Sequence, residues 1–363
     1  MNKNKIYLFG FSRWKHGFIK SFLKEYENKD IIFINPIFSS HYKLALKKGL
    51  DKDSQVFIWG KKEFKKLEDF AKENAIKITR VEDGFIRSVG LGSDLTRPYS
   101  LVLDDEGIYF DPTKPSRLET ILNTYEFDDK ILGEAKKLRE KILDTKISKY
   151  NTSKHKELYL PKDKVKILVS GQVEDDASIK YGANGMTNLQ LLKEVKQDNP
   201  KAYIVFKPHP DVLSGNRIGN IPENEALKYC DEIVVDISMS SVLHAVDEVH
   251  TMTSLTGFEG LLYDKKVVTY GMPFFAGWGL TLDKKSCKRR KRILTLDELI
   301  AGVYILYPRY IHPRTLEYCT PSKLIDELEK ERQKLKNNII YNYKSKIYSY
   351  LSRLSQKILS MVK

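Results

Sequence analysis

The sequence predicts an α/β protein with two domains, each built on a mainly parallel, doubly wound sheet. With 363 residues, the chain is longer than one typical domain. Short apolar runs alternate with amphipathic stretches in two successive series, which begin near residues 6 and 165. The polar stretch 149–157 lies between the series and is typical of a linker. We therefore expect two doubly wound domains that face each other across a cleft.

The first series begins with short apolar runs that end in glycine or in polar residues, as buried strands do. The expected strands are 6–9, 31–34, 55–59 and 77–81, and the expected helices are one that ends near residue 26, then 62–74, 118–125 and 130–148. Two further runs, 99–103 and 108–110, flank the acidic turn 104–107 and predict a β-hairpin.

The second series repeats the alternation of strand and helix patterns after the linker. The expected strands are 165–169, 203–206, 233–235, 248–251 and 267–270, and the expected helices are 186–197, 223–228, 240–246, 254–263 and 296–304. Neither a GxGxxG fingerprint nor a P-loop is present. We expect an N-terminal domain over 1–155, a C-terminal domain over 156–320 and a tail over 321–363.

Composition argues for a protein of a reducing compartment. The three cysteines are widely spaced and form no CxxC pair, which disfavours a disulfide framework or a zinc site. The apolar run at the N-terminus is too short for a signal peptide, and no stretch reaches the roughly 18 apolar residues of a membrane span. We expect a cytoplasmic protein.

The net charge of +14 is concentrated at the C-terminal end. Eight basic residues and no acidic residue follow Glu331, so more than half of the net charge lies there. Apolar residues from Leu335 to Leu359 recur close to helical spacing, which predicts a basic amphipathic helix suited to an anionic membrane surface. For the first half of this tail, packing on the N-terminal domain is the alternative.

A second basic run, residues 284–292, has the composition of a loop. It contains no interleaved aromatic residue, and the chain carries no zinc-finger, RRM or KH pattern. We therefore expect no nucleic-acid partner.

Carboxylates follow two of the predicted strands, at the sheet edge where open α/β folds build their sites. Glu174, Asp175 and Asp176 come after strand 165–169, and Glu82 and Asp83 come after strand 77–81. For the first group, the alternative is a solvated acidic loop without a catalytic role. For the second, Asp83 would cap a turn while Glu82 pairs with Arg87 or Arg80.

Two further strand ends carry groups suited to anions. Pro208 and Pro210 fix the backbone around His209, and Lys207 adds positive charge. Thr251 to Glu259 opens a helix with several hydroxyls, whose amides and dipole can hold a phosphate or merely be capped. The aromatic loop within 267–279 either lines a sugar or base pocket or belongs to the core.

Together these motifs resemble those of the capsular polysaccharide β-Kdo transferases. The specific strings are 82–92, 171–178, 207–212, 246–259 and 270–281, and the resemblance runs from about Ile6 to Leu328. The opening stretch 10–15 is more similar to the C-terminal module of the family members that carry two modules. The resemblance implies a GT-B-type glycosyltransferase fold with two Rossmann-like domains.

For the reaction, the resemblance implies a retaining transfer of Kdo from CMP-β-Kdo by double displacement. It assigns Asp176 as nucleophile, Glu82 as general acid/base and His209 as the hydrogen-bond donor to the leaving phosphate. Donor-binding roles are expected for Lys207, Thr253, Ser254, Thr256, Gly257, Glu259, Gln172 and Arg87, the last of these for the Kdo carboxylate. No metal or cofactor is expected.

The expected partners are CMP-Kdo, a lipid-linked Kdo acceptor, an anionic membrane surface and other capsule biosynthesis proteins. These place the protein on the inner face of the bacterial inner membrane. A CMP-sialic acid-dependent sialyltransferase is the alternative within the same class, because both use CMP-activated sugar acids. A non-catalytic scaffold that presents glycolipid is the alternative outside it.

Overall fold

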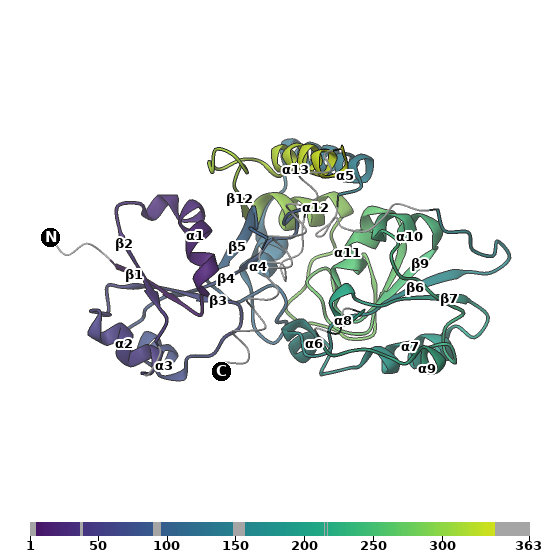
Figure 1. The fold of residues 1–363 in the computed structure, drawn as a ribbon, viewed down its shortest axis with the longest axis horizontal. Helices are drawn as coiled ribbons and strands as arrows, with labels where there is room; N and C mark the ends of the chain where they lie inside the picture. The colour runs from purple at the N-terminus through teal and green to yellow at the C-terminus, as the bar shows by residue number, and fades with distance from the viewer. Residues whose placement is uncertain are drawn as a thin grey trace. The chain divides into compact units, whose positions relative to one another are not determined.

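The computed structural model describes residues 5–36, 39–89, 96–147, 157–213, 215 and 217–337. They form two compact units (Figure 1). Unit 1 combines the residues up to Ile108 with those from Tyr304 onward, and unit 2 is Tyr109–Val303. This division differs from the boundaries expected at 155/156 and 320/321. In unit 2, the Arg139 guanidinium donates to the Leu262 carbonyl across 2.8 Å, which ties a helix before the predicted linker to the second series.

The sheet of unit 1 has six strands in the order β12-β5-β4-β3-β1-β2. Their bounds are β1 Lys5–Phe9, β2 Asp30–Ile34, β3 Gln55–Trp59, β4 Ile78–Asp83, β5 Ser100–Asp104 and β12 Pro308–Tyr310. The first four strands are parallel, and β5 runs antiparallel to both β4 and β12. The chain reverses direction across the sheet between β1 and β3, so the topological switch point lies between these two strands.

The expected hairpin of 99–103 with 108–110 is wrong. β5 pairs with β4 and β12 instead. The carboxylate of Asp104 accepts hydrogen bonds from the amides of Glu106 and Gly107 at 3.0 and 2.8 Å. This Asx turn directs the chain out of the sheet, and residues 108–110 form no strand.

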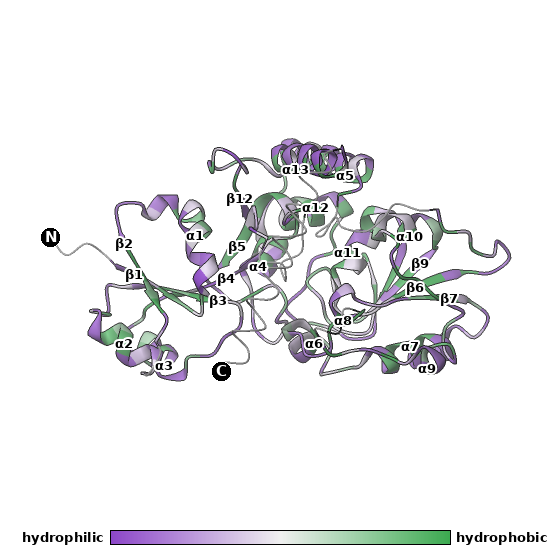
Figure 2. Ribbon diagram, in the orientation of Figure 1, coloured by the Kyte–Doolittle hydropathy of each residue, from purple (hydrophilic) through white to green (hydrophobic). Residues whose placement is uncertain are grey.

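Helices cover both faces of the parallel part of this sheet, as Figures 1 and 2 show. On one side lies α1 (His16–Ile19), whose Phe18 and Ile19 pack with Phe11 and Trp59. On the other side lie α2 (His41–Lys47) and α3 (Lys65–Glu73), which bury Ala45, Leu67 and Ala71. The stretch expected to be helical up to residue 26 is α1 with the short 3-10 turns 13–15, 20–22 and 24–26.

The sheet of unit 2 is parallel throughout, in the order β11-β10-β9-β6-β7-β8. The bounds are β6 Lys166–Ser170, β7 Tyr203–Lys207, β8 Glu232–Ile233, β9 Glu248–Thr251, β10 Lys266–Thr269 and β11 Leu282–Asp283. Counted within the unit, this is the strand order 3-2-1-4-5-6 of a Rossmann fold. Its switch point lies between β6 and β9.

The helices of unit 2 again lie on both faces of their sheet, with α7 and α9 opposite α10 and α11 (Figure 1). The bounds are α4 Arg117–Thr124, α5 Asp129–Thr145, α6 Ala177–Gly182, α7 Asn188–Asp198, α8 Pro210–Leu213, α9 Glu223–Ala226, α10 Met239–Ala245, α11 Leu255–Leu262 and α12 Leu296–Ile300. A π-helical turn, Ala301–Leu306, follows α12.

The three arginines of the basic run 284–292 form ion pairs within unit 2. Arg289 and Arg290 both pair with Glu119 of α4, at 2.6 and 3.2 Å, and Arg292 pairs with Glu298 at 2.6 Å. Arg290 is buried, and it also donates to the carbonyls of Pro273 and Ala276. These pairs use the three arginines of the run for internal packing.

The aromatic loop that follows β10 belongs to the core. Phe274, Phe275 and Trp278 are almost fully buried, and the Trp278 indole donates to the Phe274 carbonyl at 2.8 Å. Phe275 packs against α11, where a Cβ added to Gly257 would lie 2.5 Å from the Phe275 ring. The sugar-pocket interpretation of this loop is therefore replaced by the packing one.

The final helix that the structure describes is α13, Pro321–Asn337. It belongs to unit 1, and Leu324, Ile325 and Leu328 in its first half are buried. The rest of the predicted amphipathic tail, 338–363, lies outside the described residues, as do most of the predicted linker and part of the string 82–92. No helix of the described residues is long and apolar enough to cross a membrane.

Replacing Gly257 by alanine is expected to destabilise the protein by about 1–3 kcal/mol, because the new methyl group would overpack against Phe275. Gly133, exposed inside α5 with open space around its Cβ position, is the matched control. Gly133→Ala should raise stability by up to about 1 kcal/mol through helix propensity. Urea unfolding followed by circular dichroism measures both changes, and equal midpoints for the two variants would contradict the packing argument.

Candidate active site

The switch point of unit 2 is held together by the side chain of Gln172. This residue follows β6, and its amide reaches across to the loop after β9. Its Oε1 accepts from the Thr253 amide at 2.9 Å, and its Nε2 donates to Thr253 Oγ1 at 3.0 Å. Behind it, Ser170 Oγ donates to Thr251 Oγ1 at 3.0 Å. Gln172, predicted to bind the donor, is therefore the link between two strand ends.

Asn188 fixes the other side of the loop that follows β6. Its Oδ1 accepts from the Gln172 amide at 2.8 Å, and its Nδ2 donates to the carbonyls of Gln172 and Gly219 at 2.8 and 2.9 Å. Its own amide donates to Glu174 Oε1 at 2.7 Å. Asn188 is fully buried. The sequence analysis missed this residue, because only its partners lie in a recognisable motif.

Asp176 lies at the end of this loop as the N-cap of α6. Its Oδ1 accepts from the amide and the hydroxyl of Ser178, at 2.9 and 2.7 Å. Both bonds use the same oxygen and leave Oδ2 outside them. The carboxylate is half-buried and fixed in orientation, as a nucleophile needs to be. Asp175 is exposed and pairs with Arg217 at 3.1 Å, and Glu174 is bonded to Asn188.

His209 follows β7 and is held by the turn that begins α8. Its Nδ1 accepts from the Asp211 amide at 3.1 Å. A neutral imidazole bonded in this way carries its proton on Nε2, so Nε2 is a hydrogen-bond donor in both protonation states. Burial lowers the pKa of the neighbouring Lys207, and the carboxylate of Asp236 opposes that shift.

The turn that begins α11 uses most of its own amides. The Ser254 amide donates to Thr251 Oγ1 and the Thr256 amide donates to Ser254 Oγ, both at 3.2 Å. The Thr253 amide is taken by Gln172. The donors outside these bonds include the Thr253 hydroxyl proton and the Leu255 amide. The sequence predicted a phosphate site here but did not identify Leu255.

Three residues of α11 that were predicted to bind the donor make contacts within unit 2 instead. Thr256 is buried, with its hydroxyl bonded to Ser254 Oγ at 3.0 Å, and Gly257 is covered by Phe275. Glu259 is half-buried, and its charge contributes, after burial, to raising the pKa of Tyr263 to about 12. Thr256 and Gly257 thus shape the helix start from inside.

In unit 1, Glu82 and Asp83 end β4 at the edge of the sheet. Glu82 Oε1 accepts from the Asp83 amide at 3.0 Å, and a Cβ at Gly60, whose φ is +61°, would lie 3.1 Å from Oε2. Asp83, and not Glu82, forms the ion pair with Arg87, at 2.7 Å. Arg80 pairs with Glu68. The alternative in which Glu82 pairs with Arg87 or Arg80 was therefore wrong, because both arginines pair with other carboxylates.

Arg87, predicted to receive the Kdo carboxylate, is fully buried and is bound to Asp83 and to the Ser88 hydroxyl. Asp83 Oδ1, the second oxygen of its partner, is buried and has no hydrogen-bond partner among the residues that the structure describes. The Arg87 guanidinium is therefore occupied by Asp83 and Ser88, which disfavours the predicted contact with the Kdo carboxylate.

Two lysines that the sequence analysis did not select join these carboxylates. Lys62 follows β3 and donates to the Gly10 carbonyl, after β1, at 2.7 Å. Lys15 places its ammonium 3.1 Å from the centre of the Trp59 ring. Burial lowers the pKa of Lys15 to about 7, against the opposing charges of Glu82 and Asp83. The signal that could have identified Lys15 is the turn that begins with Gly10 directly after β1. At a switch point, such a turn places its side chains at the carboxyl edge of the sheet.

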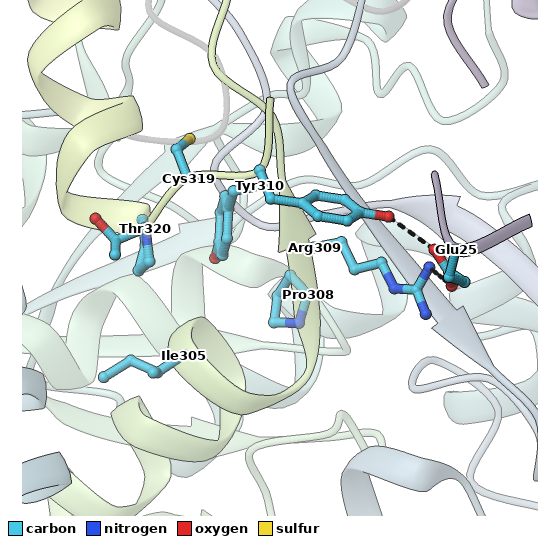
Figure 3. Close-up of a pocket in the computed structure, with 9 residues that line it drawn as sticks. Glu25, Ile305, Pro308, Arg309, Tyr310, Cys319 and Thr320 are labelled. Carbon is cyan, nitrogen blue, oxygen red and sulfur yellow. Dashed lines mark hydrogen bonds and ion pairs between the residues drawn. The ribbon is translucent and has the colours of Figure 1, made fainter. Parts of the chain in front are cut away.

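A surface pocket of about 570 Å³ lies elsewhere in unit 1 (Figure 3). There Arg309 and Tyr318 both bond to Glu25. None of the predicted site residues lines this pocket. Among the described residues, no group of three or more His, Cys, Asp or Glu side chains could hold a metal ion. The absence of a metal cofactor stays a prediction.

Comparison with known proteins identifies the family. A family model described as capsule polysaccharide biosynthesis protein matches residues 54–130 and 125–310, so the chain belongs to that family. The capsule polysaccharide modification protein LipA of Neisseria meningitidis serogroup A is 46% identical over 337 residues, which cover 93% of this chain and 47% of LipA. This chain thus spans about half the length of that relative.

Other relatives extend the comparison. The lipopolysaccharide-processing protein LpsZ of Rhizobium meliloti is 42% identical over 262 residues, which cover 70% of this chain and 60% of LpsZ. Two solved structures of Thermosulfurimonas dismutans KpsC cover 91% of this chain. The β-Kdo 2,7 transferase is 39% identical with a TM-score of 0.72 and is covered completely. The β-Kdo 2,4 transferase is 32% identical with a TM-score of 0.77 and is covered to 99%.

These similarities confirm the expected fold class, a GT-B-type α/β fold with two Rossmann-like units. They also confirm the resemblance to the β-Kdo transferases. The roles given to individual residues stay predictions, and the contacts above define what each residue can contribute.

Replacing Asn188 by aspartate is expected to destabilise the protein by about 2 kcal/mol or more. The change removes two donated hydrogen bonds and places a buried carboxylate oxygen against the carbonyls of Gln172 and Gly219. Asn224→Asp, on the exposed surface of α9, is the matched control and should change stability by less than about 0.5 kcal/mol. Chemical denaturation measures both, and an Asn188→Asp protein as stable as the control would contradict the assigned contacts.

Proposed function

We propose that this protein is a retaining β-Kdo transferase that moves Kdo from CMP-β-Kdo to a Kdo-bearing glycolipid in the synthesis of a capsule or other surface polysaccharide. The observation that carries the proposal is the 39% identity to a β-Kdo 2,7 transferase whose whole chain is covered. The contacts at the two switch points support it, because each group that a double displacement needs has a residue of suitable chemistry.

In the first step, Asp176 Oδ2 attacks the anomeric carbon of Kdo and forms the glycosyl-aspartate, while the bond to the CMP phosphate breaks. The Ser178 bonds to Oδ1 hold the carboxylate in line during the attack. The departing phosphate keeps the electron pair of the broken bond. His209 Nε2, the Thr253 hydroxyl and the Leu255 amide are the donors that stabilise its charge.

In the second step, the acceptor hydroxyl attacks the same carbon and releases Asp176 as a carboxylate. Glu82 takes the proton of that hydroxyl as a general base. Two inversions give net retention. Lys207 contributes positive charge on the donor side, and Gln172 keeps the Thr253 turn in register with the loop that carries Asp176.

The proposed setting is the cytoplasmic face of the inner membrane, where a lipid-linked acceptor and other capsule biosynthesis proteins would be met. The support is the sequence of the tail, whose basic residues suit an anionic surface.

Intact-protein mass spectrometry after incubation with CMP-Kdo, without acceptor, tests the nucleophile. The native protein is expected to gain a Kdo-sized adduct and Asp176→Asn to gain none, with a loss of transfer of about 10³-fold or more. Asparagine can still cap α6, so the fold should persist. Glu82→Gln is the matched control, since it should form the adduct yet transfer poorly.

An adduct on Asp176→Asn would remove that residue from the nucleophile role. Consumption of CMP-sialic acid in place of CMP-Kdo, with acceptor supplied, would favour the sialyltransferase alternative. Turnover of neither donor would favour the scaffold.

Deleting residues 344–363 is expected to weaken binding to vesicles that contain anionic lipid. The deletion removes five basic residues, each of which contributes on the order of 1 kcal/mol near such a surface. Activity on a soluble acceptor should be unchanged. Co-sedimentation at low and high salt measures the effect, with neutral vesicles as the control. Equal sedimentation of the full-length and truncated proteins would exclude the tail as the membrane anchor.

A further inference from the structure

Charged side chains gather at the switch point of the unit 1 sheet. Lys15 follows β1, Lys62 follows β3, and Glu82, Asp83 and Arg87 come from the end of β4 and the loop after it. Open α/β sheets bind ligands outside the carboxyl ends of the strands at such a point. The switch point of unit 2 is assigned to the donor above, whereas at this one only Glu82 has been given a role.

Two groups in this cluster lack an ion-pair or hydrogen-bond partner among the described residues. The Lys15 ammonium faces the Trp59 ring at 3.1 Å and the Trp14 ring at 5.7 Å, and no carboxylate of the described residues lies within ion-pair distance. Asp83 Oδ1 is buried and accepts no hydrogen bond from the part of the chain that the structure describes. A half-buried ammonium calls for an anion, and a buried carboxylate oxygen calls for a hydroxyl or amide donor.

We propose that this cluster is the binding site for the acceptor's acidic sugar, with the Lys15 ammonium pairing with the sugar carboxylate. Asp83 Oδ1 accepts a hydrogen bond from one of the sugar hydroxyls. Glu82, the proposed general base, ends the same strand, so a sugar anchored at Lys15 presents a neighbouring hydroxyl to Glu82. The chemical class of the acceptor rests on the proposed function, while the anion site rests on the geometry of unit 1.

The charges around Lys15 make this site dependent on pH. Lys62 and Arg87 contribute two positive charges that Glu82 and Asp83 balance, so the sign of the cluster depends on Lys15. Burial holds the pKa of Lys15 near 7 in the free protein. A bound carboxylate favours the charged form and raises that pKa. Affinity should therefore be constant below about pH 7 and fall as the pH rises above it.

The test compares two ligands in the absence of donor, a methyl glycoside of Kdo and the methyl ester of the same glycoside. Isothermal titration calorimetry at pH 6.5 measures both affinities. The native protein should bind the acid at least about tenfold more tightly than the ester, as expected for a charge-assisted contact. Lys15→Met should bind both ligands equally, and Lys15→Arg should keep the preference.

Lys20→Met is the matched control, because Lys20 lies on the same segment but is exposed. It should behave as the native protein does. Raising the pH from 6.5 to 9 should reduce the preference for the acid in the native protein and leave it nearly constant in Lys15→Arg, whose guanidinium stays charged. If Lys15→Met does not fold, Lys15→Gln and this pair of pH profiles decide the matter.

The inference is overturned by a native protein that does not prefer the acid, by a preference that survives Lys15→Met or Lys15→Gln, or by a preference that is independent of pH in the native protein. Kdo transfer is measured separately on the native protein. Transfer without a Lys15-dependent preference refutes this inference alone. A Lys15-dependent preference without transfer from any donor refutes the proposed function and leaves the anion site standing.

Discussion

The arrangement of unit 2 depends on the hydrogen bonds that cross its switch point. The loops after the neighbouring strands β6 and β9 part there, because they lead to helices on opposite faces of the sheet (Figure 1). Gln172 closes the gap with its whole amide, donating to one group of Thr253 and accepting from another. Asn188 then fixes the backbone of Gln172 from the opposite side. Since both amides are buried and bonded, the loop that carries Asp176 has one orientation relative to the start of α11.

Charge in this protein is used differently on the surface and inside. Glu119 accepts two arginines of the run 284–292, and Arg290 continues from there to the carbonyls of the aromatic loop after β10. Removing either partner would leave a buried charge without compensation, which costs more than an exposed pair contributes. The loop that brings Trp278 and Phe275 into the core is thus held by charged side chains, a residue type that usually lies on the surface.

The sequence predicted the strands best, because each buried strand is a local apolar run. Strands 55–59 and 248–251 have the predicted bounds, and the order of strands and helices in unit 2 follows the predicted series. The pairing of β5 was missed, since its partner β12 lies about two hundred residues away. The site motifs were found through strings that resemble a family, whereas Asn188 and Lys15 carry no motif. Their roles arise from contacts with residues that only the fold brings near.

The two switch points differ in the chemistry that they offer. In unit 2, Asp176 and Lys207 are accompanied by neutral donors, which are the Thr253 hydroxyl, the Leu255 amide and His209, whose proton position is fixed by the Asp211 amide. Such groups can share a phosphate without binding it as a fixed ion pair, which suits a group that must leave. In unit 1, charged side chains dominate. Because the pKa of Lys15 is about 7, the protonation of this lysine decides whether the cluster has a net positive charge. A site of this kind favours a charged ligand that stays in place while a neighbouring hydroxyl reacts, so a carboxylate-bearing acceptor fits unit 1 and a departing nucleotide fits unit 2.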